Sequence, residues 1–227
     1  MDLTFIKKIP FFQGLEDHEY QLLSPLLIEK EVKKGQHIFH EGDVGTESYL
    51  IKQGRVKIYR LTNGKESILA LLHKGDFFGE MAMLDPHNSR SASAVALEKT
   101  NLLQLREKDM TSLLHKKPEL AIKLLSLTME KLRRANEKIQ SITFLDVRTR
   151  IHRLILQLVQ DYGIQTSEGV FIDYKITHQQ MADLIGAVRE TVSKILAEWQ
   201  QEGWIIMKNR KMIIKDFSQF EQLIQED

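Results

Sequence analysis

The sequence contains no cysteine among its 227 residues. This absence excludes disulfides, thiolate zinc sites, cysteine-ligated iron–sulfur clusters and cysteine nucleophiles. The sequence also lacks an uncharged apolar run near the roughly 18 residues that a membrane-spanning helix needs. The first apolar stretch is interrupted by Lys7, Lys8 and Pro10 and has no small-residue cleavage pattern. We therefore expect no signal peptide, no membrane partner and a cytoplasmic location.

An excess of charge of one sign is missing as well, because the formal net charge is +1. A uniformly basic coat for nucleic acid is excluded, although a local basic patch is not. With 42% hydrophobic and 28% charged residues, the composition is that of a globular protein. The length suits two modules that each bury a core.

Short alternating apolar runs, punctuated by glycine about every ten residues, extend from about Val32 to Leu105. The runs 48–51 and 55–59 favour strands, and the step 52–54 between them predicts a hairpin. Asn63-Gly64 predicts a second hairpin, because this dipeptide readily supplies positive φ angles. We expect an antiparallel β-roll or jelly roll.

After Pro118 the apolar pattern has a period of 3.5 residues, which predicts a long helix. The pattern fits either a two-stranded coiled-coil seam or an ordinary amphipathic helix packed on its own domain. Three heptads of small and branched residues favour a homodimer. The stripe comprises Ala121, Leu125, Thr128, Leu132, Ala135, Ile139 and Ile142.

The chain then passes a hinge at residues 144–146, where Asp146 is placed to cap a helix over 147–162. A loop that contains Gly163 and Gly169 is expected next. Thr177 and Gln180 form a capping box, and Gly186 separates a short helix from a second helix over 189–201. This order predicts a helix-turn-helix, and the apolar runs 204–207 and 211–214 predict a β-hairpin wing.

The second of these helices begins with side chains that can read DNA bases. An arginine such as Arg189 can form two hydrogen bonds to guanine, and Glu190 can accept one from cytosine. Lys194 lies one turn further on, so Glu190 and Lys194 are also interpretable as a solubilising i,i+4 pair. Residues 189–215 carry six basic and three acidic side chains, which favours phosphate contact.

A second motif suits a phosphate ligand. Gly79, Glu80, Met81 and Ala82 are expected to start a short helix, with Arg90 and Ser91 closing the site from a neighbouring strand. Because a carboxylate repels phosphate, Glu80 is interpreted as an acceptor for a sugar hydroxyl. A structural ion pair between Glu80 and Arg90 explains the residues equally well.

His37, His40 and Glu41 are candidate metal ligands of a catalytic jelly roll. A spacing of three along a strand would place the two histidines on opposite faces. We therefore expect no metal site and no enzyme.

Taken in order, these motifs resemble the cyclic-AMP receptor protein/FNR superfamily of bacterial transcription regulators. The resemblance includes Gly79-Glu80 with Arg90-Ser91, the hinge Phe144-Leu145-Asp146-Val147, and Arg189-Glu190-Thr191-Val192. It implies an α+β protein with an N-terminal cyclic-nucleotide-binding β-roll (residues 1–118), a dimerisation helix (119–143) and a winged helix-turn-helix (144–227).

The resemblance also implies roles for residues. Gly79, Glu80, Arg90 and Ser91 would hold the ribose and cyclic phosphate, while Arg189, Glu190 and Lys194 would address bases. Thr177, His178 and Gln179 would meet DNA phosphates, and Ser193 matches the FNR branch. At the positions that meet adenine and its surroundings, this chain has Lys131, Ala135 and Asn136, which alters the half of the site that reads the base.

The sequence therefore predicts a homodimeric regulator that binds palindromic double-stranded DNA under control of cyclic AMP or a related cyclic nucleotide. Its recognition helices would lie about 34 Å apart. RNA polymerase is a further candidate partner. Two alternatives stay open: a ligand-independent regulator with an empty roll, controlled by a protein partner or constitutively active, and a nucleotide-binding module with vestigial DNA binding.

Overall fold

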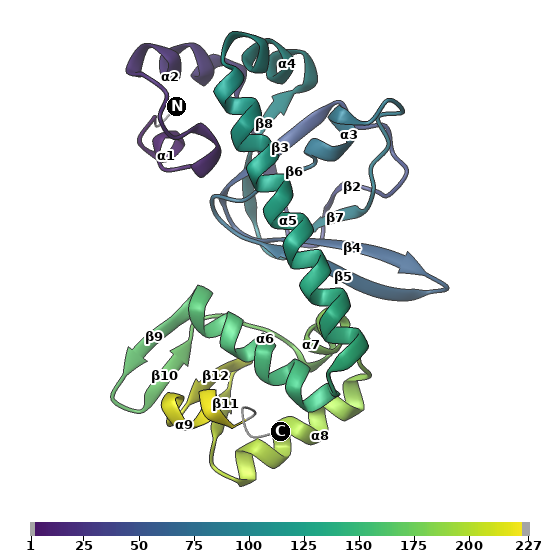
Figure 1. The fold of residues 1–227 in the computed structure, drawn as a ribbon, viewed down its shortest axis with the longest axis vertical. Helices are drawn as coiled ribbons and strands as arrows, with labels where there is room; N and C mark the ends of the chain where they lie inside the picture. Colours follow the sequence, from purple (N-terminus) through teal and green to yellow (C-terminus); the bar gives the residue numbers. More distant parts are fainter. Residues whose placement is uncertain (1–2, 224–227) are drawn as a thin grey trace. The chain divides into compact units, whose positions relative to one another are not determined.

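A computed structural model describes residues 3–223 of the chain (Figure 1). Its internal contacts divide it into two compact units, one that ends at Leu132 and one that begins at Arg133. The division falls inside a long helix, α5 (Pro118–Phe144), which contributes residues to both units. Each unit has its own set of buried side chains.

The first unit contains two four-stranded antiparallel sheets, with strand orders β1-β8-β3-β6 and β2-β7-β4-β5 (Figure 1). This arrangement confirms the predicted β-roll. The strands are β1 (Ile28–Val32), β2 (His37–Phe39), β3 (Glu47–Gln53), β4 (Val56–Thr62), β5 (Lys65–Leu72), β6 (Phe77–Phe78), β7 (Ser93–Ala96) and β8 (Thr100–Arg106).

Short helices accompany the sheets: α1 (Leu3–Lys7), η1 (Pro10–Phe12), α2 (Asp17–Leu23), η2 (Ser24–Leu26), α3 (Glu80–Leu84) and α4 (Glu107–Lys116). The N-terminal helices and the start of α5 share a core with one sheet, in which Phe11, Leu103 and Leu120 are buried. A second core, around Ile51 and Phe78, lies within the roll. Apolar side chains from both helices and strands therefore pack together in the core of the first unit.

One of the two predicted hairpins is confirmed and the other is wrong. Strands β4 and β5 join at Asn63 (φ 53°) and Gly64 (φ 74°) in antiparallel register. The step at residues 52–54 instead carries the chain from β3 in one sheet to β4 in the other. Gly54 has φ 97°, and a Cβ there would lie 2.7 Å from the Cα of Thr100. The alternating pattern cannot separate these cases, because a strand looks alike whichever sheet it joins.

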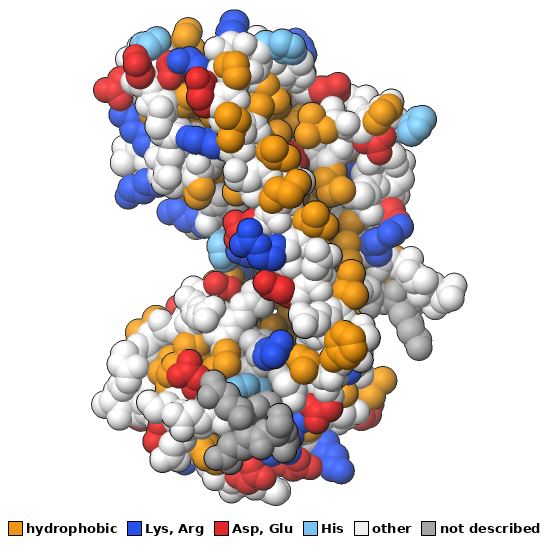
Figure 2. Space-filling model, viewed as in Figure 1, with side chains coloured by type: hydrophobic (Ala, Val, Ile, Leu, Met, Phe, Trp, Pro, Cys, Tyr) orange, Lys and Arg blue, Asp and Glu red, His pale blue; other side chains and the backbone are white. Residues whose placement is uncertain are grey.

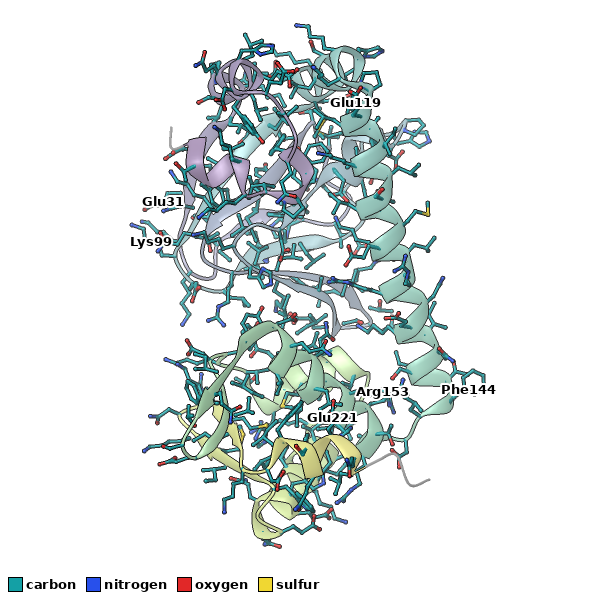
Figure 3. All side chains as sticks on the ribbon, turned by 60° about the vertical axis from the view of Figure 1, so that its left-hand side comes forward. Glu31, Lys99, Glu119, Phe144, Arg153 and Glu221 are labelled. Atoms are coloured by element: carbon teal, nitrogen blue, oxygen red, sulfur yellow. The ribbon has the colours of Figure 1, made fainter. Side chains whose placement is uncertain are left out.

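Helix α5 confirms the long helix predicted after Pro118. Its N-terminal part buries Leu120 and Leu124 in the first unit. Hydrophobic side chains are exposed along the rest of the helix (Figure 2), and at its end Phe144 points away from the backbone (Figure 3). The exposed apolar residues are Ile122, Leu125, Met129, Leu132, Ile139, Ile142 and Phe144.

The second unit is the predicted winged helix-turn-helix. Its elements are α6 (Val147–Tyr162), β9 (Gly163–Thr166), β10 (Gly169–Ile172), α7 (His178–Ile185), α8 (Arg189–Gln201), β11 (Ile205–Lys208), β12 (Lys211–Ile214) and α9 (Phe217–Gln222). Asp146 caps α6 as expected, since its Oδ1 accepts a hydrogen bond of 2.7 Å from the Thr149 amide.

The prediction of a loop around Gly163 and Gly169 is wrong. These residues begin the two strands of a hairpin, and β10 joins the wing in a sheet of order β11-β12-β10-β9. Val170 and Ile172 are buried on one side of β10. Two alternating apolar residues, Val170 and Ile172, are too short a pattern to distinguish a strand from a loop in sequence.

His37 and His40 do not lie on opposite faces of a strand as predicted. Strand β2 ends at Phe39, so His40 is free of the strand's alternation, and the two imidazoles stack with centroids 4.3 Å apart. Within residues 3–223, no group of three or more His, Asp and Glu side chains lies where it could hold a metal ion. No helix in that range is long and apolar enough to cross a membrane.

Candidate functional site

Arg90 is a buried charge in the first unit, with only 3% of its surface exposed. Its Nη1 donates a hydrogen bond of 2.7 Å to the Gly79 carbonyl, and its Nη2 lies 3.4 Å from Glu47 Oε2. The guanidinium also lies over the Phe39 ring, 4.2 Å from its centroid. Its Nε is buried and has no hydrogen-bond partner within the described chain. One N–H of this buried cation is therefore unpaired within residues 3–223.

Two glycines leave the space that this guanidinium occupies. A Cβ on Gly45 would lie 2.1 Å from Arg90 Nε, and a Cβ on Gly79 would lie 2.9 Å from Nη1. Gly79 also has φ 79°, which glycine adopts without strain. Burial lowers the pKa of Arg90, while Tyr49 and Glu47 oppose that shift. A guanidinium remains protonated at neutral pH, so the site keeps its positive charge.

Glu80 begins helix α3 and is almost fully buried. Glu80 forms its ion pair with Lys131 and not with Arg90, which was the structural alternative in the sequence. Its Oε1 accepts a hydrogen bond of 2.7 Å from Lys131 Nζ, and Lys131 also donates 3.1 Å to the Phe77 carbonyl. A residue of the long helix therefore holds the carboxylate beside the arginine site.

The structure brings seven of the nine predicted ligand residues together around Arg90 and Glu80, and the two that it does not are Ala135 and Asn136. Met81 is exposed, Ala82 is buried, and Ser91 Oγ lies 3.7 Å from Met81 Sδ. Because Ala82 is buried, its side chain serves the core. Ala135 and Asn136 are exposed on the part of α5 that belongs to the second unit.

The helix-turn-helix of the second unit has the predicted local geometry. Thr177 Oγ1 accepts from the Gln180 amide at 3.1 Å, and Gln180 Oε1 accepts from the Thr177 amide at 3.0 Å, which confirms the capping box. Gly186 ends α7 in the left-handed region with φ 65°. Ala182 and Val192 are fully buried, as expected where α7 and α8 pack together.

Arg150, which no sequence motif indicates, holds the turn between α7 and α8 in place. Its Nη1 donates 2.5 Å to the Ile185 carbonyl and 3.3 Å to the Gly186 carbonyl. These carbonyls end α7 and would otherwise lack helical partners. The contact joins residues 35 positions apart, so no local pattern announces it.

His178 and Ser193, both predicted DNA contacts, bond to each other. His178 Nδ1 lies 2.8 Å from Ser193 Oγ. This contact links the first residue of α7 to the second turn of α8. Burial lowers the pKa of His178, and the nearby Arg189 charge lowers it further. Gln179 Nε2 donates 2.7 Å to Asp183 on the exposed side of α7.

The three predicted base readers are all exposed at the beginning of α8. They are Arg189, Glu190 and Lys194. Beyond α8, the wing turns at Asn209 (φ 53°) and Arg210 (φ 62°), as its sequence suggested. Lys175, Lys208 and Lys211 border a hollow of about 310 Å³ beside this tip. Lys175 and Lys208 are exposed, whereas Lys211 is half-buried and pairs with Asp173.

Comparison with known proteins gives two matching family models. The one described as a cyclic nucleotide-binding domain matches residues 29–117, and the one described as a Crp-like helix-turn-helix domain matches residues 149–223. They coincide with the arginine site and with the helix-turn-helix described above.

Relatives match over nearly the whole chain. The chain is 32% identical over 206 residues to the CRP-like cAMP-activated global transcriptional regulator of Mycobacterium tuberculosis, covering 90% of this chain and 92% of that protein. It is 33% identical over 219 residues to the cyclic AMP receptor protein of Thermus thermophilus, covering 96% and 98%. The solved structure of a CooA variant from Carboxydothermus hydrogenoformans has the same fold, with a TM-score of 0.80 at 20% identity, covering 98% and 95%.

The fold and its two sites define a DNA-binding transcription regulator that carries a cyclic nucleotide-binding domain. The chain belongs to the Crp/Fnr family of these regulators.

The histidine between α7 and α8 gives a testable pH response. We expect His178 to titrate below the usual histidine pKa of about 6.5. A histidine with a lowered pKa in the folded state stabilises the fold above pH 6.5, roughly, and loses that contribution as pH falls toward its folded pKa. Arg189→Gln should raise the pKa of His178 part of the way, because burial is the larger cause. An NMR titration of the histidine resonances measures this. Arg153→Gln, on α6, is the control, and an unchanged pKa in Arg189→Gln contradicts the assignment.

Proposed function

We propose that this chain is a homodimeric transcription regulator whose binding to palindromic DNA is controlled by a cyclic nucleotide, with cyclic AMP as the first candidate. The observation that carries the proposal is the buried Arg90 guanidinium, whose Nη1 donates to the Gly79 carbonyl and whose Nε has no partner within residues 3–223. Burying a charge is costly unless it has a partner, so the site favours an anionic ligand. The names of the relatives in Mycobacterium and Thermus, which refer to cyclic AMP, support the same ligand class.

In this proposal the cyclic phosphate binds Arg90 and Ser91, while Glu80 accepts a hydrogen bond from a ribose hydroxyl. Gly79, Met81 and Ala82 supply the backbone around it. The base would meet Lys131, Ala135 and Asn136, whose amide can bond a purine edge. We expect no metal, no iron–sulfur cluster and no catalysis. The cytoplasm is the proposed location.

We propose that two copies associate through the exposed apolar face of α5. Leu125, Leu132 and Ile139 recur every seven residues along it, and Leu132 is 52% exposed in the single chain. A seven-residue repeat of apolar residues is the pattern of a two-stranded coiled coil. Burial of this face in a second copy removes its apolar surface from water.

For DNA, we propose that Arg189, Glu190 and Lys194 contact bases, while Thr177, His178 and Gln179 lie near phosphates. Ser193 would act through its bond to His178 as well as through DNA. The effect of ligand binding would be transmitted to the helix-turn-helix of each copy through α5 and the hinge at residues 144–146. To act as a switch, the ligand must bind the DNA-competent state better, with a typical coupling of about 1 to 3 kcal/mol. RNA polymerase is the further partner we propose.

A ligand-independent regulator is the second candidate function. It is favoured by the way the site satisfies itself, since Glu47 pairs with Arg90 and Lys131 pairs with Glu80. Calorimetric titration with cyclic AMP and cyclic GMP separates the two. Heat of binding supports the first proposal, and its absence together with full operator affinity supports the second.

The ligand role of Arg90 can be tested by substitution. Arg90→Lys keeps the charge but loses the fork of parallel donors, so cyclic AMP affinity should fall about 10- to 100-fold. Calorimetry measures the affinity, and circular dichroism checks the fold. Arg60→Lys, at the exposed arginine of β4, is the matched control. Retained affinity in Arg90→Lys would remove Arg90 from the ligand site.

The dimer can be tested on α5. Leu132→Glu places a charge on the apolar face, and we expect the protein to sediment as a monomer at micromolar concentration. Arg133→Gln, one residue further on the helix and off the apolar stripe, should leave the dimer intact. Sedimentation velocity gives the mass of each variant. A wild-type chain that is monomeric would contradict the proposal.

Base reading by Arg189 has a distinct signature. Arg189→Ala should relax the preference at one position of the half-site, at a cost of about 1 to 3 kcal/mol. Selection of binding sequences with wild-type protein supplies the operator, and a titration at several salt concentrations measures affinity. Arg153→Ala on α6 (Figure 3) is the control. A uniform, salt-dependent loss would instead make Arg189 a phosphate contact.

A further inference from the structure

Glu47 lies between two cationic regions of the first unit. On one side its Oε2 is 3.4 Å from Nη2 of the buried Arg90. On the other side it borders a cleft of about 640 Å³, which Arg106 and Lys108 also line. Its side chain is 31% exposed, while that of Arg90 is 3% exposed, so Glu47 marks the boundary between the interior and the cleft.

The strand register supplies a second partner for this carboxylate. Glu47 on β3 is directly opposite Arg106 on β8. Residues opposite each other in an antiparallel pair share a face of the sheet, and their Cβ atoms lie about 4.5 to 5.5 Å apart. Arg106 is therefore a second cation next to Glu47 on the same face of the sheet.

The position of Glu47 conflicts with an anionic ligand on Arg90. A phosphate at the guanidinium would lie close to a carboxylate, and two like charges at such a distance repel strongly where water is scarce. The long distance of 3.4 Å makes the present Glu47 contact weaker than a close charged hydrogen bond. Glu47 is thus a resident anion that an incoming phosphate must displace.

We propose that Glu47 sets the affinity for the anionic ligand by competing for Arg90, and that it transfers to Arg106 when the ligand binds. The inference rests on the proposed function, because it assumes an anion at Arg90. It assigns to Arg106 a role that neither the ligand motif nor the helix-turn-helix contains. Glu47 and Arg106 act here by positioning and neutralising charge.

The main test compares charge-removing variants by calorimetry with cyclic AMP. Glu47→Gln should bind about tenfold more tightly than wild type, because the competing charge is gone. Glu47→Ser removes the same charge, so it should show the same direction and serves if Glu47→Gln is unstable. Glu107→Gln is the matched control, since Glu107 lines the same cleft. Equal affinities of wild type and Glu47→Gln, or an equal gain in Glu107→Gln, overturn the proposal.

The transfer to Arg106 is tested by a double-mutant cycle. Arg106→Gln should weaken cyclic AMP binding about threefold in the wild-type background, because displaced Glu47 loses its second partner. In the Glu47→Gln background the same substitution should have no effect. An equal loss of cyclic AMP affinity in both backgrounds would show that Arg106 acts independently of Glu47. That result would contradict the transfer of Glu47 to Arg106.

Inorganic phosphate, used as a probe in place of a cyclic nucleotide, separates this inference from the proposed function. If neither wild type nor Glu47→Gln binds a cyclic nucleotide, the proposed function fails, and inorganic phosphate then decides the inference alone. Stabilisation by phosphate, measured as a rise in Tm, should be larger in Glu47→Gln than in wild type or Glu107→Gln. If wild type binds cyclic AMP through Arg90 but Glu47→Gln binds no more tightly, the proposed function stands and the inference is rejected.

Discussion

The buried guanidinium of Arg90 is the constraint around which the first unit is arranged. A charge removed from water needs acceptors, and the chain supplies the Gly79 carbonyl, the Glu47 carboxylate and the face of Phe39. Gly45 and Gly79 leave the room that it occupies. These neighbours come from separate strands and turns, so the roll must close before the arginine is satisfied. Its Nε has no hydrogen-bond partner within residues 3–223.

The neighbouring pair between Glu80 and Lys131 connects this site to the long helix. Lys131 lies on α5, one residue before the exposed Leu132, and it holds both Glu80 and the Phe77 carbonyl. A ligand that competes for Glu80 would therefore act on the same helix that carries the apolar stripe. Such a connection is what an allosteric protein needs, because the ligand must distinguish two arrangements of a shared element.

In the second unit, the turn before α8 and the start of α8 are held by contacts from α6 and α7. Arg150 of α6 bonds to the carbonyls at the turn, and His178 of α7 bonds to Ser193 of α8. The exposed start of α8 is therefore presented on a rigid support. Rigid presentation favours sequence discrimination, because side chains that are already positioned lose less entropy on binding.

The sequence by itself determined the β-roll, the long helix and the winged helix-turn-helix, because periodicity, caps and Asn-Gly turns are local signals. It also named Arg90, Glu80 and the start of α8 as candidate site residues. Only the tertiary structure decided that residues 52–54 join two sheets, that β10 extends the wing, and that His178 bonds to Ser193. It alone paired Arg90 with Glu47, 43 residues away in the chain. The physical reason is that these partners are chosen by packing in space, and packing brings together side chains whose separation in sequence carries no pattern.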